Sequence, residues 1–410
     1  MVMSTNVIFV APYFLDATTQ FIDATTRVPD CRVGLVSCDS EDKLPAELRS
    51  RLSAHFRVQD ITTAELRRGV EAIGKHFGSV DRLLGMLEQI QVPLGEIRDQ
   101  LGIAGVGGQT ANHFRDKSVM KTVLRQNGIP CAAHQLIDNH EAATEFAQRI
   151  GFPLIVKPPD GAGAKGTYRC ENQGQLNECL ETLRPQPDNP VLLEQFVTGE
   201  EFSFDSVAIG GRLVWHSISR YQPRPLEVVE EPWIQWCVII PKETDGPEYS
   251  AIKQVAEPAI RALGLETGLS HMEWFRLPNG QVAVSEVGAR PPGAQIMSLM
   301  SYAHNLDMYQ AWAELMIHDR FACPPREYAC GAAYLRGMGQ GKKIVAVHGL
   351  DNVAKQFQDV VVEARLPKYG QSPSSSYEGD GFIIVRHADT DVVQNVLKEI
   401  ITHVRVETGD

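Results

Sequence analysis

The stretch from His271 to Gly293 contains the pattern that most restricts the fold of this chain. Two runs of alternating apolar and polar residues flank Asn279-Gly280, and Asn-Gly is a strong signal for the two-residue turn of a β-hairpin. Side chains that are paired across such a turn share one face of the hairpin. The predicted pairs on that face are Leu277 with Val282, Phe275 with Val284, and Glu273 with Glu286.

Glu273 and Glu286 would oppose each other at the end of an otherwise apolar face. Like charges at directly opposed positions are destabilising, so this pair predicts a bound cation. Oxygen ligands in so small a number suit Mg²⁺, which takes its remaining ligands from water and phosphate. Arg290 follows shortly after the second strand and could meet an anionic substrate. The alternative is a surface hairpin with two solvated glutamates, and a slip in register would separate them.

The composition indicates a globular protein of more than one domain. A length of 410 residues predicts two or three domains. A formal net charge of −12 argues against nucleic acid or an anionic membrane as a partner. The eight cysteines are scattered without a CxxC pair, which is typical of a reducing cytoplasm. We expect neither a signal peptide nor a membrane span, because the start lacks a basic segment and no run of about 18 apolar residues occurs.

Strand and helix patterns alternate through the first 112 residues. Short apolar runs predict strands at 6–12, 31–37, 55–59 and 80–86, and helical spacing predicts helices at 62–77 and 93–103. This alternation favours a small doubly wound parallel sheet. The glycine run at 105–108 comes too late after the first strand for a dinucleotide-binding motif, and we interpret it as a loop.

A glycine- and lysine-rich loop follows a predicted strand at 152–159, which ends near Lys157. The residues of interest in the loop are Gly161, Gly163, Lys165 and Gly166. Glycines without bulky neighbours let backbone N–H groups approach an anion closely, and the lysines add charge. A flexible linker is the alternative, but the position of the loop between two strands weakens it.

Further elements are predicted around this loop. A helix capped by Asp116 or Ser118 is predicted, with its apolar positions at Val119, Val123 and Leu124. Strands are predicted at 132–137, 191–197, 200–209 and 212–221, and helices at 140–151, 175–183 and 247–265. We interpret the proline-rich segment 223–241 as a long connection and a candidate substrate lid.

The C-terminal part is predicted to be mixed. After Gly293 the chain is mostly helical up to residue 318, and the last segment contains several strands. A closing helix at 390–407 would turn inward Val393, Val396, Leu397 and Ile400. His271 and His304 are candidates for acid–base chemistry, with packing in the core as the alternative.

The ordered set of these residues resembles an ATP-grasp enzyme over about residues 115–320. The resemblance rests on Arg115-Asp116-Lys117, Lys157, the loop DGAGAKG, the segment LLEQFVTGEEFSFD, and Glu273, Glu286 and Arg290. It implies a mixed α/β fold with an ATP-grasp core. The expected domains are a doubly wound domain at 1–112, an ATP-grasp domain at 113–322 (divided into 113–200 and 201–322), and a mixed domain at 323–410.

By this resemblance, the chain has an ATP site. Lys117 and Lys157 would neutralise the phosphates, and Gly161, Gly163 and Gly166 would fold over the β- and γ-phosphates with the help of Lys165. The adenine and ribose contacts would come from Glu194, Phe196, Val197 and Glu201.

The resemblance also implies a metal site and a catalytic arginine. Glu273 and Glu286 would hold Mg²⁺, for which Mn²⁺ could substitute, and Arg290 would steady the transferring phosphoryl group. The family usually has Asn two residues after the second glutamate, where this chain has Gly288. The sequence therefore leaves open whether one or two metal ions bind.

The expected activity is that of a carboxylate–amine ligase. Such an enzyme phosphorylates a carboxylate with ATP, and an amine then displaces phosphate to form an amide. The segment GARPPG resembles the amino-acid ligase branch, so amino acids are the expected substrates and a homodimer is plausible. The alternatives are an enzyme that activates bicarbonate or formate, and a nucleotide-binding regulatory protein without catalysis.

Overall fold

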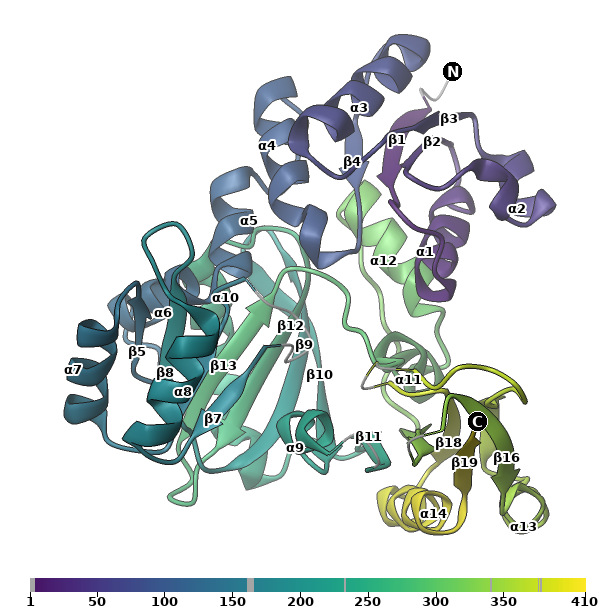
Figure 1. Cartoon of the computed structure of the whole chain (residues 1–410). Coiled ribbons are helices and arrows are strands. Elements are labelled where there is room, and N and C mark those ends of the chain that lie inside the picture. The colour runs from purple at the N-terminus through teal and green to yellow at the C-terminus, as the bar shows by residue number, and fades with distance from the viewer. Residues whose placement is uncertain (1–3, 161–165, 232–233, 340, 375, 377) are drawn as a thin grey trace.

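The computed structural model describes residues 4–160, 166–231, 234–339, 341–374, 376 and 378–410. The chain forms an N-terminal α/β unit, a small antiparallel unit, and a long sheet that continues into the C-terminal segment (Figure 1). The predicted mixed α/β class with a parallel N-terminal sheet is confirmed. Among the residues that the structure describes, no helix combines the length and apolar character needed to cross a bilayer.

The N-terminal sheet is parallel and has helices on both faces. Its strand order is β3-β2-β1-β4, with bounds β1 Thr5–Val10, β2 Cys31–Ser37, β3 Ala54–Arg57 and β4 Arg82–Leu84. The helices are α1 Asp16–Thr26, α2 Ala46–Arg51, α3 Thr63–Phe77, α4 Gln91–Leu101 and α5 Gly108–Arg115, with 3₁₀ turns at Glu41–Lys43 and Glu88–Ile90. Successive residues of β1 enter two different cores, as expected for a strand that is covered on both faces.

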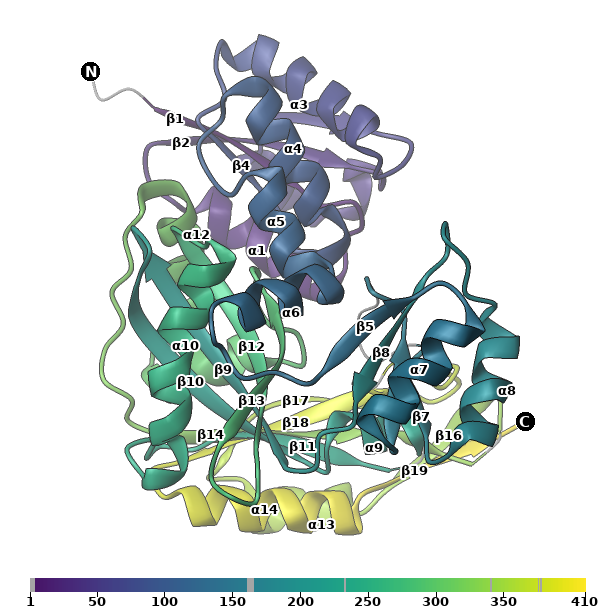
Figure 2. The ribbon, with the colours of Figure 1, turned by 90° about the vertical axis from the view of Figure 1, so that its left-hand side faces the viewer.

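A small antiparallel unit follows helix α6, Lys117–Gln126. Its strand order is β5-β8-β6-β7, with bounds β5 His134–Ile137, β6 Leu154–Lys157, β7 Tyr168–Cys170 and β8 Val191–Gln195. Helices α7 His140–Ile150 and α8 Gln173–Leu183 pack on this sheet through one shared core (Figure 2).

An eight-stranded sheet forms the centre of the molecule, with the order β13-β12-β9-β10-β11-β14-β18-β17. The bounds are β9 Glu200–Ile209, β10 Arg212–Gln222, β11 Trp236–Ile240, β12 Gly268–Arg276, β13 Val282–Gly288, β14 Ala329–Leu335, β17 Val361–Arg365 and β18 Gly381–His387. Because β11 pairs with both β10 and β14, the sheet crosses residue 322. The division of the chain into three domains stays a prediction.

The interpretation of 223–241 as a long connection is wrong. This segment contains helix α9 Pro225–Glu230 and strand β11. The run WCVII is wholly buried and pairs with β10 on one side and β14 on the other. These two strands supply the hydrogen-bond partners of its backbone, and they cannot be recognised from the sequence of the segment alone.

Helices cover both faces of the central sheet. On one face lie α6 and α10 Ser250–Leu263, which is preceded by a 3₁₀ turn at Pro247–Tyr249. On the other lie α11 Ile296–His304 and α12 Met308–His318, and α12 also packs against α1 of the N-terminal unit. This packing joins the N-terminal unit to the central sheet through a single hydrophobic core.

The C-terminal segment adds a second, three-stranded sheet with the order β15-β19-β16. The bounds are β15 Gly337-Met338, β16 Lys343–His348, β19 Arg405–Gly409, α13 Leu350–Phe357 and α14 Thr390–His403. The predicted inward side chains of α14 are all buried. The helix ends at His403 rather than at residue 407, because the last residues pair with β16.

The turn of the β12–β13 hairpin differs from the prediction. Leu277 pairs with Gln281 rather than with Val282, because the backbone N–H of Leu277 donates to the Gln281 carbonyl at 2.8 Å. Three residues, 278–280, therefore form the turn, and Gly280 has a φ of 80°, which glycine adopts readily. The predicted pair of Phe275 with Val284 is likewise wrong: Phe275 pairs with Ala283, and Trp274 pairs with Val284.

The pair of Glu273 with Glu286 is confirmed despite this shift. Ser285 is an extra residue in β13, opposite the step from Glu273 to Trp274. Such a β-bulge moves the register by one residue. The bulge thus compensates for the longer turn and brings the two carboxylates to opposed positions.

Candidate active site

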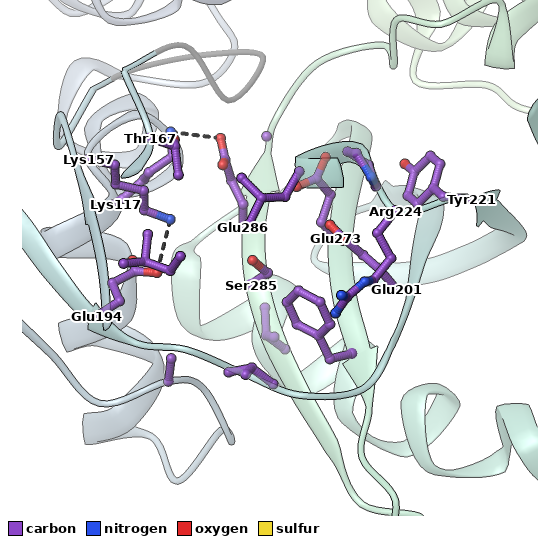
Figure 3. Close-up of a pocket in the computed structure, with 18 of the residues that line it drawn as sticks. Lys117, Lys157, Thr167, Glu194, Glu201, Tyr221, Arg224, Glu273, Ser285 and Glu286 are labelled. Atoms are coloured by element: carbon purple, nitrogen blue, oxygen red, sulfur yellow. Dashed lines mark ion pairs between the residues drawn. The ribbon is translucent and has the colours of Figure 1, made fainter. Parts of the chain in front are cut away.

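A cavity of about 210 Å³ lies between the β5–β8 sheet and the β12–β13 hairpin. Side chains from all three parts of the chain line it. Figure 3 shows lysines and glutamates from different elements pointing into the same space. Its charged lining residues are Glu88, Lys117, Lys121, Lys157, Glu194, Glu201, Arg224, His271, Glu273, Glu286 and Arg290. Of the predicted site residues that the structure describes, all except Gly166 and His304 line this cavity.

Lys117 is fixed by its place at the start of α6. The Asp116 carboxylate caps this helix and accepts hydrogen bonds from the backbone N–H groups of Ser118 and Val119, at 2.8 and 2.9 Å. Lys117 is buried, and its Nζ lies 2.9 Å from Glu286 Oε1. The cap therefore holds an ammonium group beside one of the paired carboxylates.

Glu194 pairs with two lysines, the buried Lys121 of α6 and the partly buried Lys157 of β6. Lys157 Nζ lies 2.9 Å from Glu194 Oε2, and Lys121 Nζ lies 3.4 Å from Oε1. Burial alone would raise the pKa of Glu194, but the two ammonium groups lower it below its usual range. Burial alone would lower the pKa of Lys157, but Glu194 and Glu286 raise it overall. Both members of this pair therefore stay charged at neutral pH.

Glu194 also has a polar atom that the protein leaves without a hydrogen bond. Among the described residues, none makes a hydrogen bond with the buried Oε1, so the contact with Lys121 is electrostatic. A buried acceptor without a hydrogen bond is costly. This oxygen is accordingly suited to accept from a donor on a bound molecule.

His271 connects Glu273 to a fully buried carboxylate. Its Nδ1 lies 2.7 Å from Asp205 Oδ1, and its Nε2 lies 3.8 Å from Glu273 Oε1. Burial alone would lower the pKa of His271, but Asp205 and Glu273 outweigh burial and raise it to about 9. In turn, the imidazolium lowers the pKa of Glu273 against the effect of burial. Glu273 is therefore an anion at neutral pH.

The far end of the cavity contains Glu201, Tyr221 and Arg224. Figure 3 shows these side chains beyond Glu273 as seen from Lys157. Burial, and then repulsion from Glu273, raises the pKa of Glu201 to about 8. Burial also raises the pKa of the Tyr221 hydroxyl. A neutral carboxyl and a phenol at this end can donate hydrogen bonds to a substrate.

Arg290 reaches a carboxylate of the N-terminal unit. Its Nε donates a hydrogen bond to Glu88 Oε2 at 2.5 Å, and Arg115 Nη1 lies 3.5 Å from Glu88 Oε1. Burial alone would raise the pKa of Glu88, but Arg290 and the other cations lower it. The N-terminal unit therefore contributes directly to the wall of the cavity.

The glycine-rich loop is only partly described. Gly161, Gly163 and Lys165 lie outside the described residues. Gly166 is exposed with a φ of 70°, and the following Thr167 lines the cavity.

The segment after β8 lines the cavity as predicted. Phe196 and Val197 both face it, and the Arg169 guanidinium lies 4.2 Å from the centre of the Phe196 ring. His304, in contrast, does not line the cavity. It contacts the Pro324 carbonyl at 2.8 Å through Nδ1 and packs against Trp215, so its role is structural.

Sequence reasoning missed Lys121, Glu88 and Asp205. For Lys121 a signal was present, because it follows Lys117 by one helical turn and so shares its face. The apolar positions predicted at Val119 and Val123 obscured this signal; α6 instead buries Lys117, Met120, Lys121 and Leu124. For Glu88 no local pattern exists, since its partner Arg290 lies 202 residues away in sequence.

The paired carboxylates fit a magnesium ion that is shared with phosphate. Among the described residues, no group of three or more His, Cys, Asp or Glu side chains could hold a metal by itself. Mg²⁺ typically takes one or two carboxylates, with the remaining ligands from water and substrate phosphates. Glu273 and Glu286, opposed across the hairpin, match that requirement.

Comparison with known proteins agrees with this geometry. Residues 122–302 match the family model of the ATP-grasp domain. These residues form an ATP-grasp domain. The predicted family is thereby confirmed, and ATP and Mg²⁺ are the cofactors of that family.

Relatives of this ATP-grasp protein include known ligases. An L-arginine-specific L-amino acid ligase from Bacillus subtilis is 25% identical over 279 residues, which cover 67% of each protein. An L-amino acid ligase from Bacillus licheniformis has a similar structure, with a TM-score of 0.78 over both full chains at 17% identity. An N5-carboxyaminoimidazole ribonucleotide synthetase from Thermotoga maritima has a TM-score of 0.70 at 16% identity, over 99% of this chain and all of that one. The chain thus contains an ATP-grasp domain and shares its fold with these ligases.

Proposed function

We propose that this ATP-grasp protein joins the carboxylate of one amino acid to the amine of another, with conversion of ATP to ADP and phosphate. The observation that carries the proposal is the convergence of three groups in one cavity: the lysines of the nucleotide side, the opposed pair Glu273 and Glu286, and Arg290. The similarity to L-amino acid ligases supports amino acids as substrates.

The lysine-lined wall suits the ATP phosphates. Lys117 and Lys157 each hold a carboxylate at 2.9 Å, and phosphate oxygens could take the place of those partners. The buried Oε1 of Glu194 could accept from the amino group of adenine, and the backbone after β8 would form the hinge. Glu273 and Glu286 would hold Mg²⁺, which would neutralise charge on the phosphates.

The reaction requires two displacements at this site. A substrate carboxylate oxygen attacks the γ-phosphorus of ATP, ADP leaves, and an acyl phosphate forms. The amine nitrogen then attacks the acyl carbon, phosphate leaves, and the nitrogen loses a proton. Arg290 and the lysines are placed to stabilise the negative charge that develops on the transferred phosphoryl group.

The far end of the cavity suits the amino-acid substrates. Arg224 offers a cation for a carboxylate, while Tyr221, Trp236 and Ile296 offer apolar contacts. Glu201, which stays largely protonated near neutral pH, could donate to a carboxylate or accept from an amine once ionised. The predicted contact of Glu201 with ribose remains a second assignment for this residue.

A release assay tests the proposal. ADP and phosphate would be measured with ATP and Mg²⁺ alone, with pooled amino acids, and with bicarbonate or formate. Release that depends on amino acids is the expected result, and division of the pool would then name the substrates. Release with bicarbonate or formate alone would indicate a carboxylase-type activity, and ATP binding without release under any mixture would indicate a regulatory protein.

We also propose that the reaction takes place in the cytoplasm. A cytoplasmic location accords with the eight cysteines, all of which are free. Homodimer formation and binding of a second metal ion remain predictions. Gly288 lies opposite His271 at the end of the hairpin, so a second ion would need a ligand other than the usual asparagine.

A further inference from the structure

Lys121 takes no part in the proposed reaction, yet it is completely buried at the base of the cavity. A buried ammonium group is strongly disfavoured unless it is paired and hydrogen-bonded. Accordingly, burial lowers the pKa of Lys121, and Glu194 offsets only part of this effect. An apolar side chain would fill this position at lower cost, which indicates a specific role for the charged one.

The principal contact of Lys121 is with the bulge in β13. Its Nζ donates a hydrogen bond to the Ser285 carbonyl at 2.7 Å. Ser285 is the extra residue between Val284 and Glu286, which both have partners in β12. Lys121 therefore binds the main chain at the point where the register of the hairpin changes.

Helix α6 holds two consecutive residues of β13 with two lysines that are one turn apart. Lys121 contacts the Ser285 carbonyl, and Lys117 contacts the Glu286 carboxylate. The neighbouring residues are also held: the Val284 N–H donates to the Pro130 carbonyl at 2.8 Å, and the Val287 N–H donates to Met120 Sδ at 3.2 Å. The whole bulged segment is thus fixed from α6 and the chain that follows it.

The bulge decides which way Glu286 points. Neighbouring side chains in a strand face opposite sides of the sheet. If the bulge did not form and the register of the outer hairpin continued through the same residues, Ser285 would stand opposite Glu273. Glu286 would then point away from the cavity, and the pair of carboxylates would be lost.

We propose that Lys121 is a positioning residue, which holds the Ser285 bulge so that Glu286 stands opposite Glu273 and the two can share a metal ion. This inference rests on the proposed function of the two glutamates. Lys121 acts through the backbone of Ser285 and touches neither the substrate nor the metal. Lys121 also pairs with Glu194, which in turn pairs with Lys157. Lys121 therefore links the Ser285 bulge to the part of the cavity lining that contains Lys157.

The test compares ADP binding with and without Mg²⁺ in the full-length chain. Isothermal titration calorimetry would give the ratio of the two dissociation constants for the wild type, Lys121→Met, Lys121→Arg and Arg125→Met. Methionine matches lysine in length but lacks the charge and the donor, whereas arginine keeps both. Arg125 is exposed on the same helix and serves as the control.

Lys121→Met should reduce the strengthening of ADP binding by Mg²⁺ at least about tenfold, while metal-free ADP binding changes little. Lys121→Arg should recover most of the Mg²⁺ effect, and Arg125→Met should leave it unchanged. An unaltered ratio in Lys121→Met, or an equal loss of metal-free ADP binding, would overturn the inference. A wild type that shows no Mg²⁺ effect would overturn the metal site and the proposed function together.

A second variant covers the case in which Lys121→Met does not fold. Deletion of Ser285 removes the bulge and joins Glu286 directly to Val284, so that a continuous ladder places Glu286 opposite Glu273 without any contact from Lys121. Combined with Lys121→Met, this deletion should therefore restore the Mg²⁺ effect. A folded double variant that still lacks the Mg²⁺ effect would show that Lys121 does not act by placing Glu286. Hydrogen exchange of the Val284–Val287 amides gives a readout without any ligand: it should increase in Lys121→Met and remain unchanged in Arg125→Met.

Discussion

Replacement of Glu286 by Gln should abolish most ADP formation and leave the fold intact. Gln keeps the length of the side chain and an oxygen that can accept from Lys117 Nζ, which lies 2.9 Å away in the native protein. Because the Glu286 side chain is 26% exposed, the lost charge should lower the free energy of unfolding by only about 1 kcal/mol. The variant leaves Glu273 to hold the metal alone, and removal of one preorganised electrostatic group lowers kcat about 10²–10³-fold.

The assay is ADP release at increasing Mg²⁺ concentration with pooled amino acids, together with thermal unfolding of the free protein. Glu200→Gln is the matched control: Glu200 pairs with Arg276 in the same sheet and does not line the cavity. Turnover by Glu286→Gln within about threefold of the wild type at saturating Mg²⁺, which corresponds to less than 1 kcal/mol in the barrier, would refute the metal assignment.

Three further results are expected. Burial lowers the pKa of His216 from 6.5 to about 4, so the free energy of unfolding should fall as the pH drops from 6.5 to about 4. His216→Gln should lose less stability over this pH range in thermal denaturation. An equal loss in the variant would contradict the lowered pKa. In Gly331→Val the added side chain would collide with Leu397 Cδ1, which should lower the free energy of unfolding by about 1–3 kcal/mol in a denaturant titration; an unchanged midpoint would count against this packing. Asp205→Asn should move the pKa of His271 from about 9 toward 6.5 in an NMR titration, and an unshifted resonance would disprove the ion pair.

The parallel N-terminal sheet could be predicted because its strands are short apolar runs with helical patterns between them. The strand β11 could not be predicted in the same way. Its five residues follow a proline-rich segment, and they form a strand only because β10 and β14 pair with them. The partner β14 lies far along the chain, so no local pattern reveals this pairing.

The carboxylate pair was predicted correctly from a turn that was assigned incorrectly. A two-residue turn with a continuous ladder would pair Glu273 with Glu286. The three-residue turn and the bulge that the structure contains give the same pair. Turn length depends on local residues, but the bulge is held by Lys121, which is 164 residues away from Ser285 in sequence. The hairpin sequence alone therefore cannot distinguish the two arrangements.

The continuity of the central sheet affects how the protein can be divided. A fragment that ends at residue 322 would contain every described lining residue of the cavity but would lack β14, β17 and β18. Strand β11, with all five residues buried in the intact chain, would then become an open, apolar edge. Such edges pair with other chains, so this fragment should aggregate rather than act as a minimal ligase. The C-terminal segment thus covers the edge of the sheet that carries the cavity, because β14 pairs with β11. Any shortened version of the protein must cover this edge in another way.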